Sequence, residues 1–73
     1  MEKRVLTMSS QTTAMKAKRL LLKYGISVRL VRLSPRLTPK GCAWGLEMNV
    51  YAVSNVLNHL EENEISFGEI MEI

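Results

Sequence analysis

The length of 73 residues predicts one small domain spanning residues 1–73, with a thin core, because such a chain buries only about 60% of its unfolded surface. The composition, 47% hydrophobic with four Gly and two Pro, is typical of a folded domain and favours it over a disordered tail. No apolar run approaches the roughly 18 residues of a membrane span, and residues 1–10 lack the apolar stretch of a signal peptide. The single cysteine cannot form an internal disulfide, so a cytoplasmic protein with no membrane partner is expected.

The net charge of +3 is divided unevenly along the chain. All ten Lys and Arg residues lie between Lys3 and Lys40, and six of the seven acidic residues follow Gly41, so the halves carry about +9 and −6. In one compact domain the halves pack together, and cations of a first helix are expected to face carboxylates of a second. The residues concerned are Lys16, Lys18, Arg19 and Lys23 on one side and Glu61, Glu62 and Glu64 on the other. Head-to-tail pairing between chains would use the same charges.

The first half of the chain predicts a strand, a helix and a second strand. Residues 4–8 form a short apolar-rich run with a β-branched centre, and Ser9-Ser10 form a turn that can cap a helix. Over residues 11–24 apolar side chains recur at spacings of three and four, which is typical of an amphipathic helix. Gly25 supplies the left-handed conformation that commonly ends helices. Residues 26–31 then alternate in character, which predicts a strand.

The second half predicts a loop, a strand and a helix. Residues 34–41 contain two prolines and a glycine, which interrupt a sheet ladder. Residues 43–48 alternate between large apolar and smaller side chains, so we expect a half-buried strand in which Gly45 lets another group approach. Asn49 is a suitable N-cap for an amphipathic helix that ends near Asn63.

Residues 65–73 give a last strand with a less regular pattern. The resulting order predicts an α+β, ferredoxin-like βαββαβ fold, with a four-stranded antiparallel sheet and two helices on one face. The opposite face is then free for a partner or a second subunit, and an exposed apolar sheet face would favour a homodimer.

Most enzyme constellations are missing from the sequence. His59 is the only histidine, no aspartate is present and no glycine-rich nucleotide loop is found, which argues against a self-contained enzyme. One Cys and one His cannot complete a zinc site without other chains, so neither a metal nor a cofactor is expected. His59 has polar neighbours and is expected to be an exposed imidazole.

RNA binding is one alternative function, because RNA-binding domains share this strand order. Only four aromatic residues are present, and the two central strands lack the aromatic-rich ribonucleoprotein motif. A nucleic-acid partner is therefore not expected.

Cys42 carries the one sulfur able to do covalent chemistry as a nucleophile. Positive charge stabilises a thiolate, so Lys40 and Arg36 would lower the pKa of Cys42, and Gly41 would let a partner approach closely. Alternatively, Cys42 continues the alternating apolar series of the strand and is a packed, inert side chain. In that case a non-catalytic interaction or regulatory subunit of a cytosolic enzyme is the expected function. These residues alone leave both interpretations open.

The chain resembles the putative selenium/sulfur carrier protein-like family, a group of short bacterial and archaeal proteins, over most of its length. The matching segments are Ser9-Ser10, Ala14 to Lys18, Tyr24 to Leu30, Pro35-Arg36-Leu37, Gly41-Cys42 and the series Trp44, Leu46 and Met48. Two positions depart from the family pattern, since Ala43 stands where Gly is typical and Trp44 where an aliphatic residue is usual.

This resemblance implies a role for Cys42. The residue would accept sulfur or selenium as a persulfide or selenopersulfide from a protein donor, such as a cysteine desulfurase, and pass it to an acceptor protein. Lys40 and Arg36 would stabilise the anion.

Overall fold

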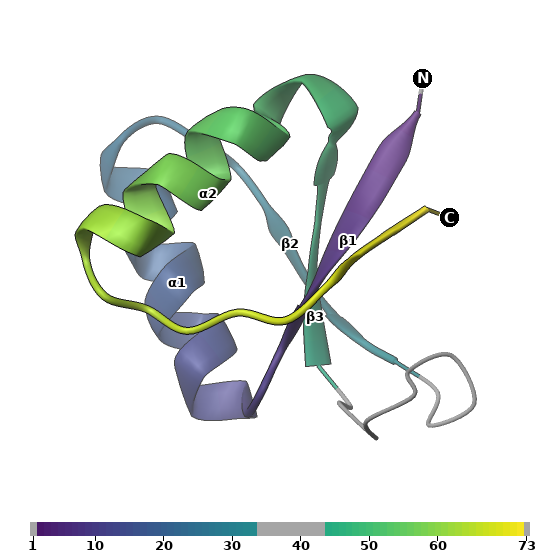
Figure 1. Cartoon of the computed structure of the whole chain (residues 1–73), viewed down its shortest axis with the longest axis horizontal. Coiled ribbons are helices and arrows are strands. Elements are labelled where there is room, and N and C mark those ends of the chain that lie inside the picture. The colour runs from purple at the N-terminus through teal and green to yellow at the C-terminus, as the bar shows by residue number, and fades with distance from the viewer. Residues whose placement is uncertain (1, 34–43, 73) are drawn as a thin grey trace.

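The protein consists of a four-stranded antiparallel sheet and two helices. The structure is a computed structural model, and it describes residues 2–33 and 44–72. The elements are β1 (Lys3–Met8), α1 (Gln11–Lys23), β2 (Arg29–Arg32), β3 (Trp44–Asn49), the 3-10 turn η1 (Val50–Ala52), α2 (Val53–Glu62) and β4 (Ile70–Glu72). The strand order in the sheet is β2-β3-β1-β4, and both helices lie on the same side of it (Figure 1). The predicted α+β, ferredoxin-like arrangement is confirmed.

The core lies between the sheet and the helices. Leu46 of β3 pairs with Leu6 of β1 on one side and with Leu30 of β2 on the other, so leucines form a row across three strands. Leu21 of α1 and Leu60 of α2 are fully buried against this row. Burial of one such side chain stabilises the fold by about 1.5–3 kcal/mol, which fixes both helices on this face.

The predicted bounds of α1 are confirmed by its two caps. At the start, the Ser10 hydroxyl oxygen accepts a hydrogen bond from the N–H of Thr13 at 3.2 Å. At the end, Gly25 has a φ of 77°, and the N–H of Ile26 donates to the carbonyl of Leu21 at 2.9 Å, a pattern known as the Schellman motif. Because Ile26 takes part in ending the helix, β2 begins later than predicted, and the expected strand start at residue 26 is wrong.

The C-terminus of α2 uses the same motif without a glycine. Asn63 is the C-cap, as predicted, and the N–H of Ile65 donates to the carbonyl of Leu60 at 2.9 Å. Glu64 supplies the left-handed residue, with a φ of 57°. A side chain in this region costs roughly 1–2 kcal/mol, so Glu64 marks a strained helix end.

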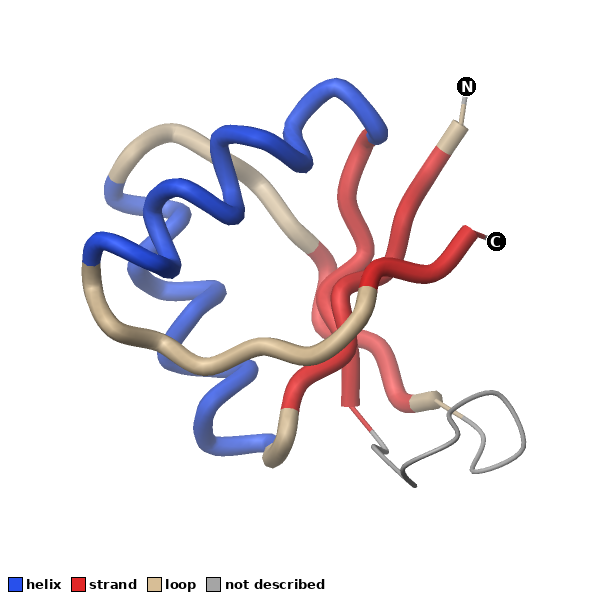
Figure 2. The backbone as a smooth tube through the Cα atoms, viewed as in Figure 1, coloured by secondary structure: helices blue, strands red, loops and turns tan. Residues whose placement is uncertain are grey.

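The flanks of α2 differ in detail from the prediction. The side chain of Asn49 accepts a hydrogen bond from the N–H of Tyr51 at 3.0 Å, so Asn49 caps η1, and α2 begins after this turn. After α2, residues 63–69 cross back to the sheet without regular structure (Figure 2). The last strand, β4, is therefore limited to three residues, fewer than predicted.

The face of the sheet opposite the helices carries a second, small apolar cluster. Val5 and Leu33 point to this face by strand alternation and are only 2% and 8% exposed. A Cβ added at Gly45 would lie 2.6 Å from Val5 Cγ1 and 3.1 Å from Leu33 Cδ1. The group that approaches Gly45 is therefore part of the chain itself. Because these side chains are buried within the chain, the exposed apolar patch that would favour a homodimer is not seen among the described residues.

Candidate functional site

The four residues predicted to form the site, Arg36, Lys40, Gly41 and Cys42, lie outside the described residues. The structure describes the chain on either side of them, up to Leu33 and from Trp44 onward. Their chemistry therefore stays a prediction. The described part of the site consists of the strand ends on either side of these residues, and we call these strand ends the site frame.

The site frame consists of Arg32 of β2, Trp44 of β3 and Met8 of β1, which lie at neighbouring strand ends. β2 and β3 are antiparallel, and Arg32 near the end of one lies opposite Trp44 at the start of the other. Residues opposite each other in such a pair have Cα atoms about 5 Å apart. Trp44 also lies opposite Met8 of β1, and Ser10, the N-cap of α1, follows closely. The chain therefore enters β3 two residues after Cys42, at the end of the sheet where β1 finishes and α1 begins.

A cation–π contact joins the two strands at this end. The guanidinium carbon of Arg32 lies 5.8 Å from the centroid of the Trp44 ring. Trp44 is partly buried against the helix-side core, whereas Arg32 is exposed. In the described part of the chain Arg32 makes no ion pair, so its charge is available at the site frame.

Arg32 was not among the residues predicted to form the site. Its only signal was its position just before the predicted loop, and the pairing with Trp44 depends on strand register, which the local pattern does not contain. The alternation itself was correctly predicted, since Leu46 and Met48 are buried on the helix side at 0% and 4% exposure.

The sheet offers no stacking platform to RNA in residues 2–33 and 44–72. Trp44, the one aromatic residue of the described strands, packs against the helix-side core, so the open face lacks aromatic side chains there. Within the same residues, no three His, Cys, Asp or Glu side chains gather as metal ligands.

The expected ion pairs between the two helices are not found in the described chain. Its ion pairs lie on the sheet, from Lys3 to Glu47 at 3.4 Å and from Arg4 to Glu2 at 3.3 Å and Glu72 at 3.6 Å. A groove of about 530 Å³ lies between α1 and the segment that follows α2. The described residues of the two helices therefore form no ion pair with one another, although Lys16 and Glu64 border the same hollow.

His59 also departs from its expected setting. Its ring stacks on that of Tyr24, with centroids 4.1 Å apart and planes 16° apart, and His59 is half-buried. This contact ties the end of α1 to α2, so the imidazole has a packing role.

Comparison with models of protein families gives a match over most of the chain. A family model described as "Putative Se/S carrier protein-like" matches residues 3–72, which include all four strands, both helices and Cys42. Searches among curated proteins and among solved structures gave no match. Neither of the described helices is long and apolar enough to cross a membrane.

Proposed function

This chain belongs to the putative Se/S carrier protein-like family, and on that premise we propose that it carries a sulfur or selenium atom on Cys42. The supporting observation is the family match over residues 3–72, which contains the only cysteine of the chain. The function is that of a carrier between two proteins, with a cysteine desulfurase-type donor on one side and an acceptor on the other.

The proposed step is thiol–persulfide exchange. The Cys42 thiolate attacks the terminal sulfur of the donor persulfide, a new S–S bond forms, and the donor S–S bond breaks to release the donor thiolate. A second exchange transfers the terminal sulfur from Cys42 to the acceptor. Electrons are neither gained nor lost overall, and a selenium atom in the terminal position follows the same course as a selenopersulfide.

Positive charge supports this exchange by favouring the thiolate over the thiol. Arg36 and Lys40 precede Cys42 closely in the sequence, and Arg32 adds a cation with no ion pair among the described residues. A lone thiol of this kind is best preserved in a reducing compartment, so the proposal includes a cytoplasmic setting.

Loading of Cys42 is the direct test of the carrier function. The full chain is incubated with a cysteine desulfurase and cysteine, and separately with glutathione persulfide, which needs no protein recognition. Intact-mass spectrometry is expected to show one added sulfur atom, located on the Cys42 peptide and removed by a reducing agent.

The Cys42→Ser variant serves as the control and is expected to gain no mass. Absence of the adduct with both donors would rule out the proposed function. An adduct with glutathione persulfide alone would support the carrier chemistry and exclude that desulfurase as the donor.

A further inference from the structure

The outer face of α1 carries cations that have no carboxylate partner among the described residues. Lys16, Arg19 and Lys23 recur along α1 at spacings of three and four, and all three are exposed. The ion pairs of the described chain use Lys3 and Arg4 instead. Unpaired cations on one face of a helix create a positive potential over that side of the molecule.

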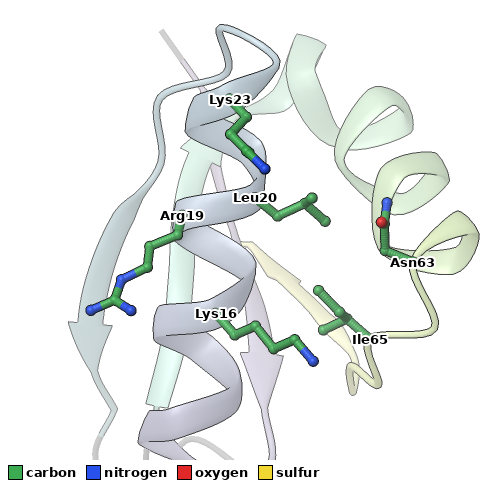
Figure 3. Close-up of a pocket in the computed structure, with 6 residues that line it drawn as sticks. All are labelled: Lys16, Arg19, Leu20, Lys23, Asn63 and Ile65. Carbon is green, nitrogen blue, oxygen red and sulfur yellow. The ribbon is translucent and has the colours of Figure 1, made fainter.

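These cations border the groove between α1 and the segment that follows α2. The groove has a volume of about 530 Å³, and its described lining residues are Lys16, Arg19, Leu20, Lys23, Asn63 and Ile65, with no carboxylate among them. Figure 3 shows Lys16 and Lys23 extending toward the space between α1 and the Asn63–Ile65 segment, whereas Arg19 extends away from it. Leu20 is half-buried and Ile65 is 6% exposed, which gives the groove an apolar floor.

The hollowed surface continues from this groove toward one end of the sheet. A further hollow of about 220 Å³ shares Lys16 and Ile65 with the groove and reaches Ser9; it also includes one carboxylate, that of Glu64. Ser9 follows Met8, which lies opposite Trp44 at the start of β3. A ligand lying along the groove would therefore end near the site frame.

We propose that the α1 groove binds a short acidic segment of a partner protein. Carboxylates of that segment pair with Lys16 and Lys23, and an apolar side chain rests on Leu20 and Ile65. The two lysines are seven residues apart, or about 10 Å along the helix axis, which fits roughly two turns of a partner helix. This proposal does not depend on the chemistry of Cys42.

Two other occupants fit the groove less well. Single-stranded nucleic acid binds through aromatic stacking as well as cations, and no described aromatic residue lines the groove. The neighbouring Tyr24 already has His59 stacked on its ring. A second copy of the chain carries a net charge of +3 and is attracted less strongly at long range than an acidic partner. Its acidic residues Glu61 and Glu62 could still reach the groove in a head-to-tail contact, which the self-association measurement below tests.

The test uses a peptide of about 15 residues, long enough to form a helix, with glutamates spaced three and four apart around one leucine. The peptide is titrated into the full chain while the methyl NMR signals of Leu20 and Ile65 are followed. Saturable shifts of both are expected, and a peptide with Gln in place of Glu is expected to give none.

Two double variants with equal charge change locate the binding surface. The variant K16Q/K23Q removes the groove cations and is expected to weaken binding about fivefold, whereas K18Q/R29Q removes two exposed cations elsewhere and leaves it within about twofold. Circular dichroism confirms that both variants are folded.

If the two variants weakened peptide binding equally, the peptide would be attracted by the overall charge of the chain and not by the groove, and the proposal would be overturned. An absence of saturable shifts would also overturn it. Tighter binding of a single-stranded DNA oligonucleotide than of the peptide, lost in K16Q/K23Q, would assign the groove to nucleic acid. Self-association of the free chain that K16Q/K23Q abolishes would assign it to a second copy.

Discussion

Thr7 shows how one buried hydroxyl holds the last part of the chain on the sheet. It is 5% exposed, and its oxygen accepts a hydrogen bond from the N–H of Glu69 at 2.7 Å. Its carbonyl accepts another from the N–H of Gly68, also at 2.7 Å. A Cβ on residue 68 would collide with the Thr7 hydroxyl, so glycine is required for this close approach.

Replacing Thr7 with Val keeps the shape of the side chain and removes the acceptor. The N–H of Glu69 is left without its partner, so we expect the free energy of unfolding to fall by about 1–3 kcal/mol. Urea denaturation followed by circular dichroism measures the change. Thr12→Val, on the exposed side of α1, is the control and should stay within about 0.5 kcal/mol of the natural chain. Equal losses in both variants would contradict the assigned role of the hydroxyl.

Gly45 makes a second prediction at the residue scale. Gly45→Ala places a methyl group against Val5 and Leu33, and this overpacking is expected to cost about 1–3 kcal/mol of stability. In the double variant Gly45→Ala/Val5→Ala the nearest contact is removed. The decreases in the free energy of unfolding of the two single variants should therefore add up to more than the decrease measured for the double variant. Strict additivity of the unfolding free energies would show that the methyl group does not meet Val5.

At the scale of the elements, the two helices end in the same hydrogen-bond motif with different residues in the left-handed position. Gly25 fills it at the end of α1 and Glu64 at the end of α2. Only glycine adopts this conformation without a penalty from its side chain.

Glu64→Gly is therefore expected to stabilise the protein by about 1 kcal/mol. The matched control is Glu62→Gly, the same chemical change at the last residue of α2, where helical backbone makes glycine unfavourable by roughly 1 kcal/mol. Thermal unfolding should thus shift upward for the first variant and downward for the second. A downward shift for both would contradict the strain assigned to Glu64.

Some features of the helices and strands could be predicted from the sequence and others could not. The order of elements and the bounds of α1 follow from local signals, namely helical periodicity, the Ser10 cap and Gly25. The start of β2 and the shortness of β4 do not, because they depend on hydrogen bonds made by Ile26 and Thr7 that carry no periodic pattern. The left-handed conformation of Glu64 could not be predicted either, since glycine is the usual residue at such a helix end.

The same distinction applies to the candidate site. Cys42, Lys40 and Arg36 were named from residue chemistry and resemblance, and their roles stay predictions. The contact between Arg32 and Trp44 required the register of β2 against β3, and the groove required the placement of residues 63–65 beside α1. Neither long-range arrangement can be read from a local sequence pattern.

At the scale of the whole molecule, the described site frame and the small hollow that adjoins the α1 groove lie at the same end of the sheet. Met8, Trp44 and Arg32 lie there in neighbouring strands, and Ser9 leads into α1. A partner protein bound along α1 would thus be guided toward the end of the chain's sheet that adjoins Cys42 in sequence.

The proposed carrier function requires Cys42 to be accessible to another molecule and to be held largely as a thiolate. Its rate of alkylation by iodoacetamide in the folded chain, measured as pH rises, tests both conditions at once. Because cations lower the pKa of a thiol, we expect the rate to reach its plateau below the ordinary thiol pKa of about 8.5. The double variant Arg36→Gln/Lys40→Gln should move the plateau to higher pH. A rate far below that of the unfolded chain, or a plateau only above the ordinary thiol range, would contradict the role proposed for Cys42.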